Sequence, residues 1–171
     1  MKSKTDRTLL ALLCLLVAAL GWTIVSGMRE RVVEVGDKAP DFRVVTDDGK
    51  TMTPKDFGGR VLVLNFWAEW CEPCVEETPS LNRFARQTAG SGVVVLGISV
   101  DTNKKLYDQF RQRFHVAFET ARDPDSNISA SYGTYKYPET YIIGRDGKVA
   151  RKIISNIDWM DPEVIRFATS L

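Results

Sequence analysis

The chain has 171 residues, which is enough for one domain and an additional segment. Hydrophobic residues make up 44% of it and charged residues 26%, as is usual for a globular protein. Residues 30–171 hold 19 basic and 21 acidic side chains, so their net charge is near −2. This balance excludes the basic surface that nucleic-acid binding needs, and no nucleic-acid partner is predicted.

The first segment, residues 1–28, is predicted to be a cytoplasmic stub followed by a transmembrane helix. No residue from Thr8 to Met28 is charged, and a helix of that length would measure about 32 Å, one hydrocarbon thickness. Three basic residues precede the stretch: Lys2, Lys4 and Arg7. They favour a cytoplasmic N-terminus, with the rest of the chain outside. A cleaved signal peptide, with its cleavage site at Ala19-Leu20-Gly21, is the alternative.

The segment after the helix is predicted to be a linker over residues 29–39, because it is charged and lacks apolar periodicity. A folded domain is predicted over 40–171, in which strand and helix signals alternate. Strands are expected at 42–45, 51–53, 61–66, 93–100, 118–120, 140–143 and 148–154. Helices are expected at 54–57, 75–88, 106–114, 125–132 and 162–170, and Asp125 is expected to cap the fourth of them. The near-continuous apolar runs at 61–66 and 93–100 are typical of buried central strands, so the pattern predicts a layered α/β domain.

Two cysteines, Cys71 and Cys74, stand between the first buried strand and a helix start. This Cys-x-x-Cys spacing indicates a redox dithiol. A zinc site needs four ligands, and outside the apolar stretch the chain adds only His115 to the pair, so no metal or other cofactor is predicted. A copper site of two cysteines and one histidine stays open. Cys14, within the apolar stretch, is interpreted as a small hydrophobic residue.

The mechanism is predicted from the position of each cysteine. Cys71 lies at a helix N-terminus, where free backbone N–H groups favour a thiolate, so it is expected to be the exposed attacker. Cys74 lies one turn further in and is expected to resolve the mixed disulfide.

The surroundings of the pair are acidic, with Glu69, Glu72, Glu76 and Glu77 and no basic residue between Glu69 and Ser80. Negative neighbours disfavour a thiolate, whereas a strong oxidant needs its thiolate stabilised, so a reductant is predicted. Glu77, one turn after Cys74, is the candidate proton carrier of the catalytic site.

The run Val63-Leu64-Asn65-Phe66-Trp67-Ala68-Glu69-Trp70-Cys71-Glu72-Pro73-Cys74 resembles the thioredoxin superfamily. The likeness is greatest to its membrane-anchored TlpA/ResA-like (CcmG/DsbE-like) thiol-disulfide oxidoreductases. It implies a thioredoxin-like fold, a central mixed sheet flanked by helices. It also implies a proline, usually cis, that faces the dithiol, and Tyr137-Pro138 fits it. Trp70, Tyr137 and Pro138 are the expected substrate-binding residues, and Glu77 falls on the position of the family's active-site glutamate.

One departure concerns Asn65, which stands where thioredoxin has a buried aspartate. Asn cannot exchange a proton, so the role of that aspartate is expected to fall to Glu77. Two further clues disagree about the branch: the spacer Glu72-Pro73 matches the ResA-like type, whereas Pro138-Glu139-Thr140 is similar to the cytochrome c maturation branch.

The predicted function is therefore an extracytoplasmic disulfide reductase that acts in cytochrome c or oxidase assembly. Its expected partners are protein disulfides (apocytochrome c or a copper-site protein) and a membrane electron donor that reduces the enzyme again. The expected location is a bacterial inner membrane, crossed once, with the N-terminus in the cytoplasm and the catalytic domain periplasmic or otherwise extracytoplasmic. A Sco-like copper-delivery protein and a peroxiredoxin-like peroxidase are the alternatives.

Overall fold

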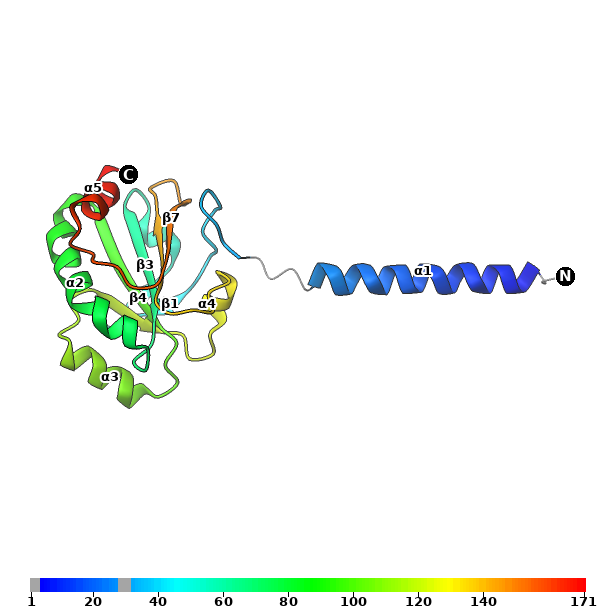
Figure 1. Ribbon diagram of the computed structural model, residues 1–171, viewed down its shortest axis with the longest axis horizontal. Helices are drawn as coiled ribbons and strands as arrows, with labels where there is room; N and C mark the ends of the chain where they lie inside the picture. Colours follow the sequence, from blue (N-terminus) through cyan, green and yellow to red (C-terminus); the bar gives the residue numbers. More distant parts are fainter. Residues whose placement is uncertain (1–3, 28–31) are drawn as a thin grey trace. The chain divides into compact units, whose positions relative to one another are not determined.

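The computed structural model describes residues 4–27 and 32–171 of the chain (Figure 1). It divides between Arg31 and Val32 into two compact units. The first contains one helix, α1 (Lys4–Gly27), where the sequence predicts a helix. By length and hydropathy, no helix within the described ranges qualifies to cross a membrane, so the predicted transmembrane helix is not confirmed. Cys14 on α1 is a free, exposed cysteine.

The second unit is built on a five-stranded mixed sheet in the order β5-β4-β3-β6-β7. Its strands are β3 (Val61–Trp67), β4 (Val93–Ser99), β5 (Glu119–Arg122), β6 (Glu139–Ile143) and β7 (Val149–Ile154). Strands β3, β4 and β5 are parallel, whereas β6 and β7 run antiparallel to their neighbours. A separate hairpin joins β1 (Val44–Val45) to β2 (Thr51–Met52).

Helical segments complete this unit. They are the 3-10 turns η1 (Pro54–Phe57) and η2 (Ala89–Ser91) and the helices α2 (Glu72–Thr88), α3 (Lys104–Arg113), α4 (Asn127–Ser131) and α5 (Pro162–Ser170). Figure 1 shows α2 and α5 on one side of the sheet and α4 on the other. The thioredoxin-like arrangement of a mixed sheet between helices is therefore present.

Strand β3 is buried along its whole length because the sheet is covered on both faces. Successive side chains of a strand point to opposite faces. Val61 and Val63 accordingly pack in the apolar cluster that contains residues of α2 and α5. Leu64 and Phe66 pack in the second large cluster, which Tyr132 and Tyr141 complete. Asn65 shares the face of Val61 and Val63, so its side chain is turned towards α2.

The domain packs residues that the sequence assigns to a linker. Val33 is buried, its N–H donates to the Tyr132 carbonyl at 3.1 Å, and the Gly36 N–H donates to the Val149 carbonyl at 2.8 Å. These contacts attach the segment 33–36 to the start of β7 and to Tyr132, the residue that directly follows α4.

Helix α4 begins differently from the prediction, which takes Asp125 as its cap. The cap is the Asp123 carboxylate, which accepts from the N–H groups of Asn127, Ile128 and Ser129 at 2.9–3.0 Å. Asp123 is buried, and Asp125 is exposed. A buried carboxylate beneath the helix start supplies the acceptors that the free N–H groups need.

Candidate active site

The dithiol lies at the start of α2, directly after the short loop that follows β3. Cys71 is the N-cap of α2, and its sulfur accepts from the Cys74 N–H at 3.3 Å. The two cysteines are joined by a disulfide, with their Cα atoms 5.2 Å apart. Pro73 fits the first helical turn because its position needs no intrahelical N–H. The pair thus has the placement that the sequence predicts.

Both cysteines are enclosed to a greater degree than the prediction of an exposed attacker implies. Cys71 keeps 5% of its surface exposed and Cys74 keeps 1%. Trp67, Tyr107 and Phe110 pack in the same cluster as the two cysteines. Cys71 is the more accessible of the two, in agreement with its expected role as the attacking cysteine.

The register of β3 and β6 brings Pro138 to the dithiol. Phe66 pairs with Glu139 in the antiparallel ladder, so Pro138, the residue before Glu139, lies beside the end of β3. The Tyr137–Pro138 peptide bond is cis, as the family resemblance implies. Tyr137 is half-buried and packs against the cluster that holds both cysteines.

An aromatic pair borders the exposed side of the dithiol. Trp70 is 64% exposed, and its ring meets that of Tyr137 edge-on with the centroids 5.9 Å apart. An exposed tryptophan held by a neighbouring ring offers apolar surface at low entropic cost. Three of the predicted site residues, Trp70, Tyr137 and Cys71, therefore lie together on one side of the protein.

Glu77 is buried inside the protein, with 3% of its surface exposed. One oxygen, Oε1, accepts from the Asn65 side-chain amide at 2.9 Å, and Oε2 accepts from the Trp159 indole N–H at 3.2 Å. Burial raises the pKa of the Glu77 carboxyl to about 7, against the opposing hydrogen bonds from Trp159, Asn65 and the Ile157 backbone. Glu77 follows Cys74 by three residues on α2, a spacing that brings Cβ atoms to about 5–6 Å.

Asn65 joins the glutamate to β6, the strand that Pro138 directly precedes. Its amide nitrogen donates to Glu77 and also to the Thr140 hydroxyl, each at 2.9 Å. Thr140 lies two residues after Pro138 on β6. The sequence singles out Asn65 only as a departure from thioredoxin, and it assigns neither Thr140 nor Trp159 a contact with Glu77.

Asp101 is a further site residue without a predicted role. Its carboxylate is buried and accepts the Glu69 backbone N–H at 3.0 and 3.1 Å, and the Ser99 hydroxyl donates to it at 2.6 Å. These bonds fix the loop between β3 and Cys71 to the end of β4. The position of Asp101 directly after a buried strand is the signal that could have identified it.

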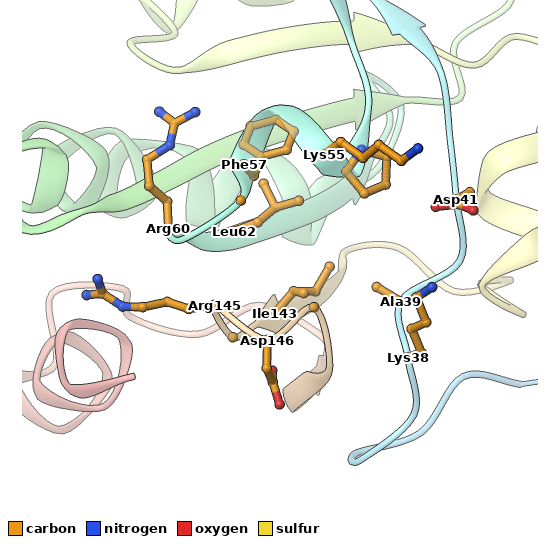
Figure 2. Close-up of a pocket in the computed structure, with 14 residues that line it drawn as sticks. Lys38, Ala39, Asp41, Lys55, Phe57, Arg60, Leu62, Ile143, Arg145 and Asp146 are labelled. Atoms are coloured by element: carbon orange, nitrogen blue, oxygen red, sulfur yellow. The ribbon is translucent and has the colours of Figure 1, made fainter.

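A cavity of about 430 Å³ lies away from the dithiol (Figure 2). Its apolar wall includes Phe57, Leu62 and Ile143. Figure 2 shows Arg60 and Arg145 towards one end of it and Lys38 and Lys55 towards the other. Leu62 stands at the start of β3, whereas Cys71 follows the end of that strand. The cavity therefore opens at the opposite end of the sheet and is not part of the active site.

His115, the third potential copper ligand, is exposed and follows α3 with a positive φ of 46°. Over residues 4–27 and 32–171, no three His, Cys, Asp or Glu side chains gather where they could hold a metal ion.

Comparison with known proteins agrees with this geometry. Residues 35–152 match the AhpC/TSA family. The chain belongs to this family. It is 32% identical over 154 residues to the thiol-disulfide oxidoreductase ResA of Bacillus thuringiensis subsp. konkukian, with 88% of this chain and 89% of that protein covered. The ResA of Geobacillus thermodenitrificans is 35% identical over 146 residues, which cover 84% and 83% of the two chains.

Solved structures of thioredoxin-like proteins superpose on this chain. A Chlorobium tepidum protein described as thiol:disulfide interchange protein DsbE superposes with a TM-score of 0.73 at 29% identity, over 80% of this chain and 98% of that one. The thioredoxin domain of a thiol-disulfide oxidoreductase from Bacteroides vulgatus shares the fold, with a TM-score of 0.72 at 21% identity over 80% and 99% of the two chains. With the Cys71–Cys74 disulfide, these relatives confirm that this AhpC/TSA-family protein is a thiol-disulfide oxidoreductase of the ResA type.

Proposed function

We propose that this oxidoreductase is a reductant of protein disulfides, with Cys71 as the attacking thiolate, Cys74 as the resolving thiol and Glu77 as the proton carrier. The observation that carries the proposal is the buried Glu77 carboxyl, one helical turn from Cys74, with a pKa of about 7. A carboxylate at this place opposes a thiolate on Cys74, so the reduced dithiol is poorly stabilised. A poorly stabilised reduced form gives up its electrons readily.

The proposed cycle begins with the reduced dithiol. The Cys71 thiolate attacks one sulfur of the client disulfide, and the other client sulfur leaves as a thiolate. Glu77 then accepts the proton of the Cys74 thiol, and the Cys74 thiolate attacks the Cys71 sulfur. The second client thiolate leaves, the Cys71–Cys74 disulfide forms, and two electrons have passed to the client. A membrane electron donor reduces the disulfide again, which returns the enzyme to its starting state.

The reduction potential tests the direction of the reaction. We expect a potential nearer to the value of thioredoxin, about −270 mV, than to that of a strong oxidant, about −120 mV. Equilibration of the protein with glutathione and dithiothreitol buffers, followed by thiol trapping, measures it. A potential close to the oxidant value would refute the assignment as a reductant.

The client class is proposed from the sequence and from the aromatic surface of Trp70 and Tyr137, which suits an extended protein segment. Haem-binding cysteines of apocytochrome c and copper-site cysteines of an oxidase are the two clients to be compared. A Cys74→Ser variant cannot resolve its mixed disulfide, so the client stays covalently bound to Cys71 and can be identified by mass spectrometry. A Cys71→Ser/Cys74→Ser variant is the control, and proteins captured by both variants are not clients.

We also propose an extracytoplasmic location at the bacterial inner membrane, which rests on the uncharged sequence from Thr8 to Met28 and the basic residues before it. Membrane fractionation of the full chain and of a chain that starts at residue 32 tests this. Recovery of both forms in the same soluble fraction would contradict it.

A further inference from the structure

We propose that Trp159 is a positioning residue that holds the Glu77 carboxylate in its proton-accepting form and so sets the pH range in which the dithiol exchanges. The inference rests on the proposed proton-carrying role of Glu77, and it assigns a part in the chemistry to a residue outside the cysteine motif.

Trp159 is fixed by three separate contacts with α2, one through its backbone and two through its indole ring. Its backbone N–H donates to the Ser80 hydroxyl at 3.3 Å, and its ring packs against Phe84 with the centroids 5.3 Å apart. Its indole N–H donates to Glu77 Oε2 at 3.2 Å. The residue is completely buried. Because the first two contacts hold the ring in place, the N–H remains aimed at the carboxylate whatever its protonation state.

The chemistry of the donor favours the charged carboxylate. An indole N–H can only donate, so it satisfies a lone pair of the carboxylate and cannot accept a bond from a protonated carboxyl. Asn65, the other side-chain donor, can rotate its amide to present an oxygen instead. Trp159 is therefore the side-chain donor whose polarity cannot reverse. Among the hydrogen bonds that oppose the effect of burial on the Glu77 pKa, its contribution is the largest.

Charged groups on the surrounding elements do not replace this contact. From α2 and the segment before α5, the side chains of Glu76, Asp158 and Asp161 are exposed. The buried Glu139 on β6 points to the face opposite Thr140. On β7, Arg151 lies over the Phe167 ring at 3.9 Å and reaches Glu163 of α5 at 3.8 Å. On α2 itself, Cys74 is the titratable neighbour, one turn away, and it is the partner of Glu77 in the reaction.

The experiment uses the Trp159→Phe variant of the full chain, which keeps an aromatic ring in the core and removes the N–H. Two quantities are measured against pH: the ¹³C chemical shift of the labelled Glu77 carboxyl, assigned with Glu77→Gln, and the rate of exchange with a model peptide disulfide. Loss of one hydrogen bond to a charged group is expected to raise the Glu77 pKa by about 1 to 2 units, and the midpoint of the rate profile should move with it.

Trp67→Phe is the matched control, because among the described residues Trp67 Nε1 is a buried nitrogen without a hydrogen-bond partner. It removes the same chemical group from the core and should leave the Glu77 pKa at the wild-type value. If Trp159→Phe does not fold, replacement of Trp159 by benzothienylalanine, in which sulfur takes the place of the N–H, makes the same test with nearly the same shape.

The outcomes separate the two proposals. A Glu77 pKa that is unchanged in Trp159→Phe overturns the role of Trp159. A raised Glu77 pKa without any step in the exchange rate at that pH, in the variant or the wild type, supports the positioning role but refutes Glu77 as the proton carrier. A joint upward shift of both midpoints supports both.

Discussion

Glu77→Gln should change how the stability of the protein depends on pH. The pKa of this carboxyl rises from 4.5 to about 7 in the folded protein. Between those pH values the folded protein keeps a proton that the unfolded chain has released, so the stability contributed by the protonated group is fully present below pH 4.5 and is lost as the pH rises towards 7. The glutamine of the variant does not ionise, so the variant lacks this pH-dependent loss of stability.

The magnitude follows from the size of the shift. A difference of roughly 2.5 pKa units corresponds to about 3 kcal/mol of unfolding free energy, because each unit is worth about 1.4 kcal/mol. Integrated between pH 5 and pH 8, the contribution of Glu77 amounts to about 2.5 kcal/mol. The side-chain amide that replaces the carboxyl also turns an N–H₂ group towards Asn65 or Trp159. That mismatch costs about 1 kcal/mol at every pH and does not alter the slope.

Urea unfolding of the oxidised protein at pH 5, 6, 7 and 8, followed by circular dichroism, measures the effect. Wild type should lose about 2.5 kcal/mol more than Glu77→Gln across this range. Glu76→Gln is the matched control, because Glu76 is an exposed glutamate on the same helix, and its pH dependence should follow that of wild type. Parallel stability curves for wild type and Glu77→Gln would show that Glu77 titrates at an ordinary pH and would refute the reasoning.

Three other substitutions have definite expected outcomes. Lys152→Met removes the cation that lies 3.3 Å from the buried Glu139 carboxylate, and it should cost about 3 kcal/mol or more in urea unfolding, part of which a second change, Glu139→Gln, should restore. Gly97→Ala places a Cβ atom 2.9 Å from Trp67 Nε1, so unfolding measurements should show a loss of about 1–3 kcal/mol. Trp70→Ala should lower kcat/KM for a protein disulfide roughly tenfold without changing the reduction potential, whereas Tyr135→Ala, at another exposed aromatic residue, should change neither.

Much of the fold could be predicted because its central strands are apolar throughout. The runs at 61–66 and 93–100 became β3 and β4 to within one residue at their ends, and α5 has the predicted bounds. The errors occur where burial in the tertiary fold decides between neighbouring candidates. Asp125 has the expected spacing for a helix cap, but Asp123 takes that role because its side chain is the one buried beneath α4.

The residues of the site also divide into those that local spacing predicts and those that only the tertiary fold brings in. Cys71, Cys74 and Glu77 lie within one short stretch, so spacing alone placed them on one helix end. Trp159 stands 82 residues after Glu77 in a segment without regular structure, and no local periodicity or motif marks it. Its contact exists only because β7 leads the chain back along α2 before α5 begins. A hydrogen bond of this kind depends on the tertiary fold and is not encoded in any local pattern.

Asn65 explains why one carboxyl can dominate the acid-base behaviour of the site. With an aspartate at this position, Glu77 Oε1 would face a second carboxylate at hydrogen-bond distance instead of the amide donor at 2.9 Å. Two such groups disfavour each other's ionisation, and they would titrate as a coupled pair with one pKa strongly raised. Asn65 instead stabilises the carboxylate, and its second N–H donates to Thr140 on β6, the strand that Pro138 directly precedes. The arrangement leaves Glu77 as a single group that titrates near neutral pH, carried on the same helix as Cys74, whose proton it is proposed to take.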